Sequence, residues 1–151
     1  MDLTSETARL VEAELRVQLA AYSSGELVGV SCIAKGADAL FAEVVLSLGG
    51  RLVVVLPSRD YRAAKVKPDY LAAFDSLLGR AAEVQTMPYD NADRDAYTAA
   101  NEYLVSECDA LFAVWDGQPP SGKGGTADVV AYARQLGTPV TVVWPSGAAR
   151  S

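Results

Sequence analysis

A glycine-rich segment near the end of the chain has the residue types of an anion-binding loop. Residues 121–126 read Ser-Gly-Lys-Gly-Gly-Thr and lie between an expected strand and an expected helix. Glycine lets a ligand approach the backbone, and the first N–H groups of a helix attract anions. We expect a phosphate or carboxylate near Gly122, Gly124 and Gly125, with Thr126 as a hydroxyl donor. The residue order is not that of a Walker A motif, and a plain connection with Thr126 as N-cap is the alternative.

Two carboxylates flank this segment. Asp128 falls in the first turn of the following helix, and Asp116 follows the preceding strand. Each could accept a hydrogen bond from a ribose, and in an enzyme each would be a candidate catalytic group for an oxocarbenium-like transition state. The alternatives are structural: Asp128 complements the helix dipole, and Asp116 forms a turn with Gly117. Trp115 could stack on a base, or its ring packs in the core.

A second polar segment follows the first expected strand. It begins with Ser31 and continues to Lys35, which could meet a phosphate or be a solvated surface lysine. Gly36 would allow close approach of a ligand, with Ala37 beside it. Asp38 is either a ligand contact or a cap for the next helix. In parallel sheets, ligands bind beyond the carboxyl ends of the strands, so this segment and the glycine-rich one are expected to share a site.

A pair of side chains on one helix is a further candidate. Tyr97 and Asn101 are spaced i, i+4 and therefore lie on one face. They either reach over the pocket or pack and hydrogen-bond locally.

Histidine is absent, which excludes Ser-His-Asp and Cys-His nucleophile chemistry and His-based zinc sites. The two cysteines, Cys32 and Cys108, are expected to be buried, reduced thiols. There is no cluster of metal ligands in the sequence. We therefore expect neither a metal nor a cofactor.

The charge balance bears on the choice of partners. The formal net charge is −6, and the 13 basic residues are scattered. Nucleic-acid binding is disfavoured, because proteins that follow a phosphate backbone usually carry a basic face. No apolar run is long enough to cross a membrane, and the start of the chain does not resemble a secretory signal, so we expect a cytoplasmic protein. A small basic group is formed by Arg59, Arg62, Lys65 and Lys67.

Helical periodicity alternates with short apolar runs along the whole chain. Such alternation predicts right-handed crossovers in an α/β fold: a Rossmann-like three-layer α/β/α sandwich with a mainly parallel sheet. Residues 1–151 are expected to form a single domain. The pattern predicts helices at 4–22, 37–48, 69–82, 92–107 and 126–136, strands at 27–33, 51–56, 84–87, 110–115 and 139–144, and a polar connection at 58–67.

Two stretches carry a resemblance to a known superfamily. Residues 31–57 (SCIAKGADALFAEVVLSLGGRLVVVLP) and 108–145 (CDALFAVWDGQPPSGKGGTADVVAYARQLGTPVTVVWP) resemble the signatures of the SLOG superfamily. That superfamily includes the Lonely Guy phosphoribohydrolases and the DNA-processing protein A group, and the chain is similar to its small bacterial members of unknown role. The resemblance implies a nucleotide-type ligand at Gly36, Ala37, Asp38, Gly124, Gly125 and Thr126.

The chain departs from the superfamily pattern in two places. Lonely Guy enzymes have a catalytic Glu where this chain has Val129, and Asp128 is displaced by one residue, about 100° around the helix. Their paired arginine has no secure counterpart here. The first strand of the superfamily is also missing, because the chain begins directly at the expected helix. Either the native chain starts upstream of Met1, or a neighbouring subunit covers the exposed sheet. An uncovered strand edge would favour aggregation, so we expect a homo-oligomer, a dimer.

Three functions follow from this reading. The first is binding of a nucleotide or nucleotide-derived metabolite at the Gly-Gly-Thr loop, as a sensor or signalling module. The second is hydrolysis of the N-glycosidic bond of a nucleoside monophosphate, with Asp128 or Asp116 as the catalytic carboxylate. The third is single-stranded nucleic-acid binding, which the acidic composition disfavours.

Overall fold

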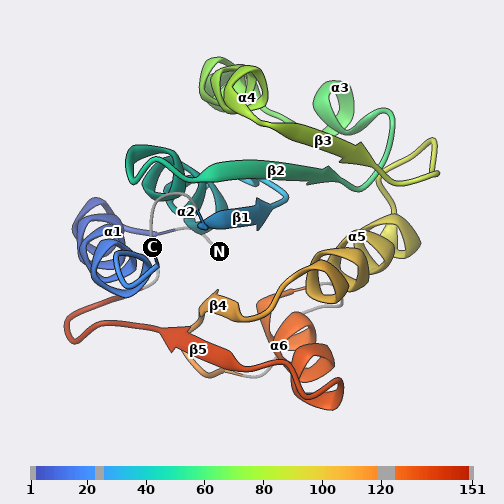
Figure 1. Cartoon of the computed structure of the whole chain (residues 1–151). Helices are drawn as coiled ribbons and strands as arrows, with labels where there is room; N and C mark the ends of the chain where they lie inside the picture. The colour runs from blue at the N-terminus through green and yellow to red at the C-terminus, as the bar shows by residue number, and fades with distance from the viewer. Residues whose placement is uncertain (1–2, 23–25, 119–124, 150–151) are drawn as a thin grey trace.

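The computed structural model describes residues 3–22, 26–118 and 125–149, and its elements alternate as the sequence pattern predicts (Figure 1). The helices are α1 (Ser5–Leu19), α2 (Ala37–Ser47), α3 (Tyr61–Lys65), α4 (Pro68–Arg80), α5 (Arg94–Glu107) and α6 (Thr126–Gln135). The strands are β1 (Val28–Ser31), β2 (Arg51–Leu56), β3 (Glu83–Thr86), β4 (Leu111–Val114) and β5 (Val140–Val143). The short helix α3 lies inside the segment expected to be an irregular polar connection.

The described strands pair in parallel, but in two sheets instead of one. One sheet has the order β1-β2-β3, and the other consists of β4 and β5. Val30 is in register with Val53 in the first sheet, and Leu111 with Val140 in the second. The parallel pairing confirms the expected class of fold. The division into two sheets was not expected, and its cause is that no described strand lies between β1 and β4.

Alternating side chains of β2 define the two covered faces of the larger sheet. Leu52 and Val54 pack in one cluster with Phe74 of α4. Val55 points to the opposite face and packs with Ala100 of α5. Successive strand residues point to opposite faces, so helices cover both sides of this sheet. The three layers of an α/β/α sandwich follow from this arrangement.

Helix α1 joins the two sheets on one face. The fully buried Leu15 of α1 shares a cluster with Val44 of α2, Val114 of β4 and Val143 of β5. On the other face, α5 contacts both β1 and α6. The two sheets are therefore held by the helices above and below them, and not by strand pairing.

No helix among the described residues combines the length and the apolar character needed to cross a membrane.

Candidate functional site

The segment after β1 is a tightly bonded loop. Ser31 Oγ accepts from Ile33 N at 3.0 Å and donates to Asp38 O at 3.3 Å. The carboxylate of Asp38 accepts from Ala34 N at 3.3 Å, and the hydroxyl of Tyr70 donates to Ile33 O at 2.8 Å. Ile33 has a φ of 47°, which is strained for a β-branched residue. These bonds hold the loop in that strained shape, as is common where a backbone is shaped for a ligand.

Burial dominates the electrostatics of this loop. It raises the pKa of Asp38 above its usual range, although the bond from Ala34 N opposes the shift. Burial also raises the pKa of the Cys32 thiol, and the nearby charge of Asp38 adds to the effect. A thiol with a raised pKa is a poor nucleophile. Cys32 and Cys108 are both free and partly buried.

The segment after β4 forms a compact turn. Asp116 Oδ1 accepts from Gln118 N, and the indole N–H of Trp115 donates to Gln118 O, both at 3.0 Å. Gly117 has a φ of 82°, a conformation that favours glycine. Asp116 therefore forms a turn, which was one of the two roles expected for it. It also lines the groove described next.

A large groove of about 930 Å³ lies between the two sheets. It collects most of the side chains and glycines that the sequence singled out. The residues of that set that line it are Ser31, Ala37, Asp38, Tyr97, Asn101, Trp115, Asp116, Gly125 and Thr126.

Other predicted residues lie elsewhere. Asp128 is exposed and is not among the residues lining the groove, whereas Val129 is. Gly36 begins α2 with a φ of 102°. Gly122 and Gly124 lie outside the described residues, so the centre of the predicted anion loop has no structural account.

Two helices begin at the groove without a side-chain cap. Gly36 is the N-cap of α2 and Gly125 that of α6, and neither position has a side-chain capping bond. Thr4 caps α1 and Asp93 caps α5, whereas α3 and α4 also lack a side-chain capping bond. The first N–H groups of an α-helix carry partial positive charge, so the starts of α2 and α6 favour an acceptor group of a ligand.

The titratable carboxyl groups of the groove give its lining an acidic character. Asp38 and Asp116 lie at the carboxyl ends of β1 and β4, and Glu26, Glu107 and Asp109 precede those strands. None of the described residues that line it is basic. A phosphate deep in this groove would be repelled by these carboxylates. No group of three or more metal-ligating side chains occurs in the part of the chain that the structure describes.

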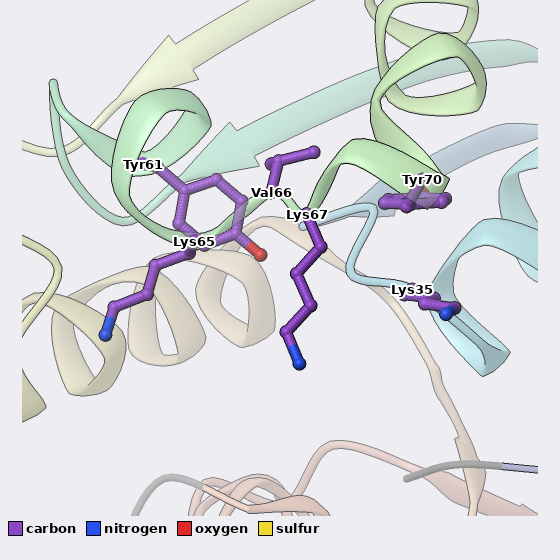
Figure 2. A pocket seen from close by; sticks show the side chains of 6 residues that line it. All are labelled: Lys35, Tyr61, Lys65, Val66, Lys67 and Tyr70. Atoms are coloured by element: carbon purple, nitrogen blue, oxygen red, sulfur yellow. The ribbon is translucent and has the colours of Figure 1, made fainter.

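The positive charges lie in a neighbouring cavity of about 250 Å³ (Figure 2). In Figure 2 the side chains of Lys65 and Lys67 both extend toward the lower part of the view, with the Lys65 amine to the left of the Lys67 amine. The Tyr61 ring meets the groove residue Tyr97 with 6.3 Å between centroids, so this pair separates the two cavities. The cavity, called the lysine cavity below, is lined by Lys35, Tyr61, Lys65, Val66, Lys67 and Tyr70.

Lys35 joins the lysine cavity to the loop after β1. Its amine makes a 2.8 Å ion pair with Asp69, and both side chains are more than half exposed. This hydrogen bond lowers the pKa of Asp69. Exposed ion pairs contribute little to stability, so Lys35 can exchange Asp69 for a ligand at low cost.

In the sequence, Lys65 and Lys67 stand out only as members of a small basic group, and no ligand site was expected there. Their place beside Lys35 depends on the packing of α3 and α4 beside the end of β1, across about thirty residues of chain. Tyr61 and Tyr70 were not singled out at all. The one available signal was the basic character of 58–67 directly after a buried strand.

Comparisons with known proteins support the fold. No protein-family model matches the chain, and no curated protein matches it. Among solved structures, the X-ray structure of DNA processing protein A from Streptococcus pneumoniae is similar, with a TM-score of 0.66 and 17% sequence identity. The match covers 95% of this chain and 47% of that chain, so this chain spans about half its length. The likeness confirms the Rossmann-like fold expected from the sequence.

Proposed function

We propose that this chain binds a nucleotide or nucleotide-derived metabolite at the carboxyl ends of β1 and β4. The observation that carries the proposal is the meeting of two unlike cavities at this edge. The lysine cavity is lined by three lysines, and the groove beside it is lined by polar side chains such as Asn101 and Asp116. A nucleotide combines an anionic phosphate with an uncharged, hydrogen-bonding nucleoside, and so it matches both.

The charges determine which way such a ligand lies. The lining of the groove is acidic, so the phosphate belongs at Lys35, Lys65 and Lys67, and the nucleoside belongs in the mouth of the groove. The start of α6 at Gly125 and Thr126 borders the mouth and offers N–H groups to the same ligand. The carboxylate of Asp116 is placed to accept from a ribose hydroxyl.

The test compares nucleotides with nucleosides. We expect nucleoside monophosphates to raise the melting temperature and nucleosides without phosphate to have a much weaker effect. Substituting both Lys65→Met and Lys67→Met should weaken binding roughly 10- to 30-fold, because two unit charges about 4 Å apart in water interact by about 1 kcal/mol per pair. Arg51→Met removes a positive charge at the opposite end of β2 and should leave binding unchanged.

Two results would refute the proposal. One is the absence of a thermal shift with any mononucleotide or dinucleotide at millimolar concentration. The other is binding that the double lysine variant and Arg51→Met weaken equally. Mass spectrometry of small molecules that co-purify with the natively isolated protein would identify the ligand class directly.

Single-stranded nucleic acid is a second candidate, because the similar structure is that of a protein named for DNA processing. The lysine cavity would then hold one phosphate of the strand. The net charge of −6 and the acidic groove weigh against a long polyanion. An oligonucleotide that binds more tightly than a mononucleotide, with a steep dependence on salt, would favour this candidate.

Hydrolysis of an N-glycosidic bond has less support. Val129 lines the groove at the position where Lonely Guy enzymes have their catalytic Glu, so no carboxylate is present there. The neighbouring Asp128 is exposed and does not line the groove. Asp116 is the remaining candidate for stabilising positive charge on a ribose. Release of free base from a bound nucleoside monophosphate, abolished by Asp116→Asn, would establish this activity.

A further inference from the structure

The basic residues between β2 and α4 are of two kinds. Arg59 and Arg62 each pair with an aspartate, at 2.6 and 2.8 Å. Lys65 and Lys67 line the lysine cavity, and within the described residues neither amine has an ion pair or a hydrogen bond. The formal net charge of the chain is −6, so carboxylates are in excess over basic groups. Two lysines that have none beside them are therefore available to an anion from outside the chain.

The backbone turns these two lysines toward one side. Val66, which lies between them, has an extended backbone with a φ of −86° and a ψ of 112°. Alternate side chains of an extended segment lie on the same side. In Figure 2 both lysine side chains extend the same way, and Val66 points the other way. Like charges on one side of a short segment repel each other, and an anion bound there would offset this repulsion.

Tyr61 adds a fixed hydroxyl group to the same cavity. The residue is 7% exposed, and its ring packs against Phe74, with 6.0 Å between centroids, and against Tyr97. Within the described residues the hydroxyl has no hydrogen-bond partner, and no such oxygen is fully buried without one, so it opens into the cavity that Tyr61 lines. Burial raises the pKa of Tyr61, and nearby Tyr97 and Asp38 add to the shift, so the hydroxyl stays a donor. Packing therefore holds a donor in place for a ligand oxygen.

The size and charge of the cavity favour one kind of group. A volume of about 250 Å³ is smaller than the roughly 300–1,000 Å³ of sites that enclose a whole drug-sized ligand. Three lysines line it, and Asp69, which pairs with Lys35, cancels one of their charges, so two positive charges remain. A phosphate monoester carries a charge of about −1.5 to −2 at neutral pH and has three terminal oxygens, whereas a diester has one charge and two such oxygens. The monoester is the better match in both respects.

We propose that the lysine cavity is specific for a terminal phosphate monoester, whose three terminal oxygens bind the hydroxyl of Tyr61 and the amines of Lys65 and Lys67. This inference rests on the proposed function for the position of the phosphate. It narrows the ligand class to nucleotides with a free terminal phosphate, and it excludes cyclic nucleotides and the diester linkages of a nucleic-acid strand. Asp69 is an internal competitor, because an oxygen of the ligand can replace its carboxylate at Lys35.

The test compares two probes that differ by one ester methyl group. Methyl phosphate and dimethyl phosphate are titrated separately into the 151-residue chain, up to high millimolar concentration, and the backbone amides of residues 61–70 are followed by NMR. We expect methyl phosphate to shift these amides saturably and to bind at least about fivefold more tightly than dimethyl phosphate, which lacks one charge and one terminal oxygen. Adenosine 5′-monophosphate should likewise bind more tightly than its 3′,5′-cyclic form.

The hydroxyl of Tyr61 is tested by its removal alone. Tyr61→Phe keeps the ring, and we expect it to weaken the binding of methyl phosphate at least about fivefold, because a hydrogen bond to a charged oxygen is lost. The melting temperature of the ligand-free protein should not fall, because the hydroxyl has no partner to lose within the described residues. A residue with a merely structural role would change stability and not the preference between the two probes.

A matched pair of variants on α4 tests the role of Asp69. Asp69→Asn releases Lys35 and should tighten the binding of methyl phosphate about two- to fivefold. Asp75→Asn breaks a similar exposed ion pair about 9 Å further along the helix, with Arg62, which does not line the cavity. At 0.15 M salt, where charges are screened beyond about 8 Å, this control should change binding by less than about 1.5-fold.

Three results would overturn the proposal. They are equal binding of the two probes, no response of residues 61–70 to methyl phosphate, and unchanged binding in Tyr61→Phe. The proposed function can fail separately: if methyl phosphate binds selectively and no nucleotide binds, the cavity keeps its preference and the nucleotide is wrong. Conversely, equal binding of adenosine 5′-monophosphate and its cyclic form would leave the proposed function intact and refute this inference.

Discussion

The hydroxyl of Tyr70 offers a direct measure of how the loop after β1 is held. It donates at 2.8 Å to the carbonyl of Ile33, and both residues are buried, at 8% and 0% exposure. Burial raises the pKa of Tyr70 to about 12, so the hydroxyl stays a donor at ordinary pH. Tyr70→Phe keeps the ring and leaves the carbonyl without this donor. An unsatisfied buried acceptor costs about 1–3 kcal/mol.

For a domain of this size, that loss corresponds to a fall in melting temperature of about 2–12 °C. Calorimetry of the wild type and of Tyr70→Phe measures it, and Tyr103→Phe, at a partly buried position on α5, is the control. We also expect faster hydrogen exchange at residues 33–36, which a general loss of packing would not localise to the loop. A melting temperature within about 1 °C of wild type, with unchanged exchange, would refute the role given to this bond.

Two further predictions concern stability. Because burial raises the pKa of Asp38, the native state holds this proton more tightly than the unfolded chain, and stability falls as pH rises through the native pKa. Asp38→Asn should therefore raise the melting temperature at pH 7, and the gain should vanish below about pH 4; an equal gain at both pH values would contradict it. An added Cβ at Gly29 would lie 2.6 Å from Val45 Cγ2 and 3.0 Å from Phe41 Cε2. Gly29→Ala should cost about 1–3 kcal/mol in urea unfolding, whereas Gly79→Ala, with open space in α4, should not destabilise.

Periodicity and end signals predicted most of the elements. The apolar run 51–56 became β2 with the predicted bounds, and Pro68 begins α4 as a first-turn proline should. Local signals of this kind act over a few residues, so they are readable from one sequence. The short helix α3 was missed because five residues give too little periodicity to distinguish a helix from a polar connection.

Only those residues of the candidate site that come directly after a strand could be predicted from the sequence. Ligands lie beyond the carboxyl ends of parallel strands, and this rule predicted that Ser31, Asp116 and Thr126 lie close together. In the structure all three line the groove. The lysine cavity was not predicted, because Lys35 and Lys67 come to line one cavity only through packing between distant elements. The φ of 47° at Ile33 had no sequence signal either, since a β-branched residue is a poor choice for that conformation and only tertiary contacts keep it there.

The separation of charge between the two cavities changes how the predicted anion site should be understood. From sequence, the glycine-rich segment was the natural place for a phosphate, because glycines and a helix start attract anions. In the structure the described part of that segment, Gly125 and Thr126, borders a groove whose charged lining residues are all acidic. The dipole of one helix start is equivalent to about half a charge, less than the full charge of Asp116 alone. Even with Lys35 paired to Asp69, Lys65 and Lys67 bring two further positive charges to the lining of the lysine cavity. Under the proposed function, the phosphate of a ligand is therefore better placed there than at the helix start.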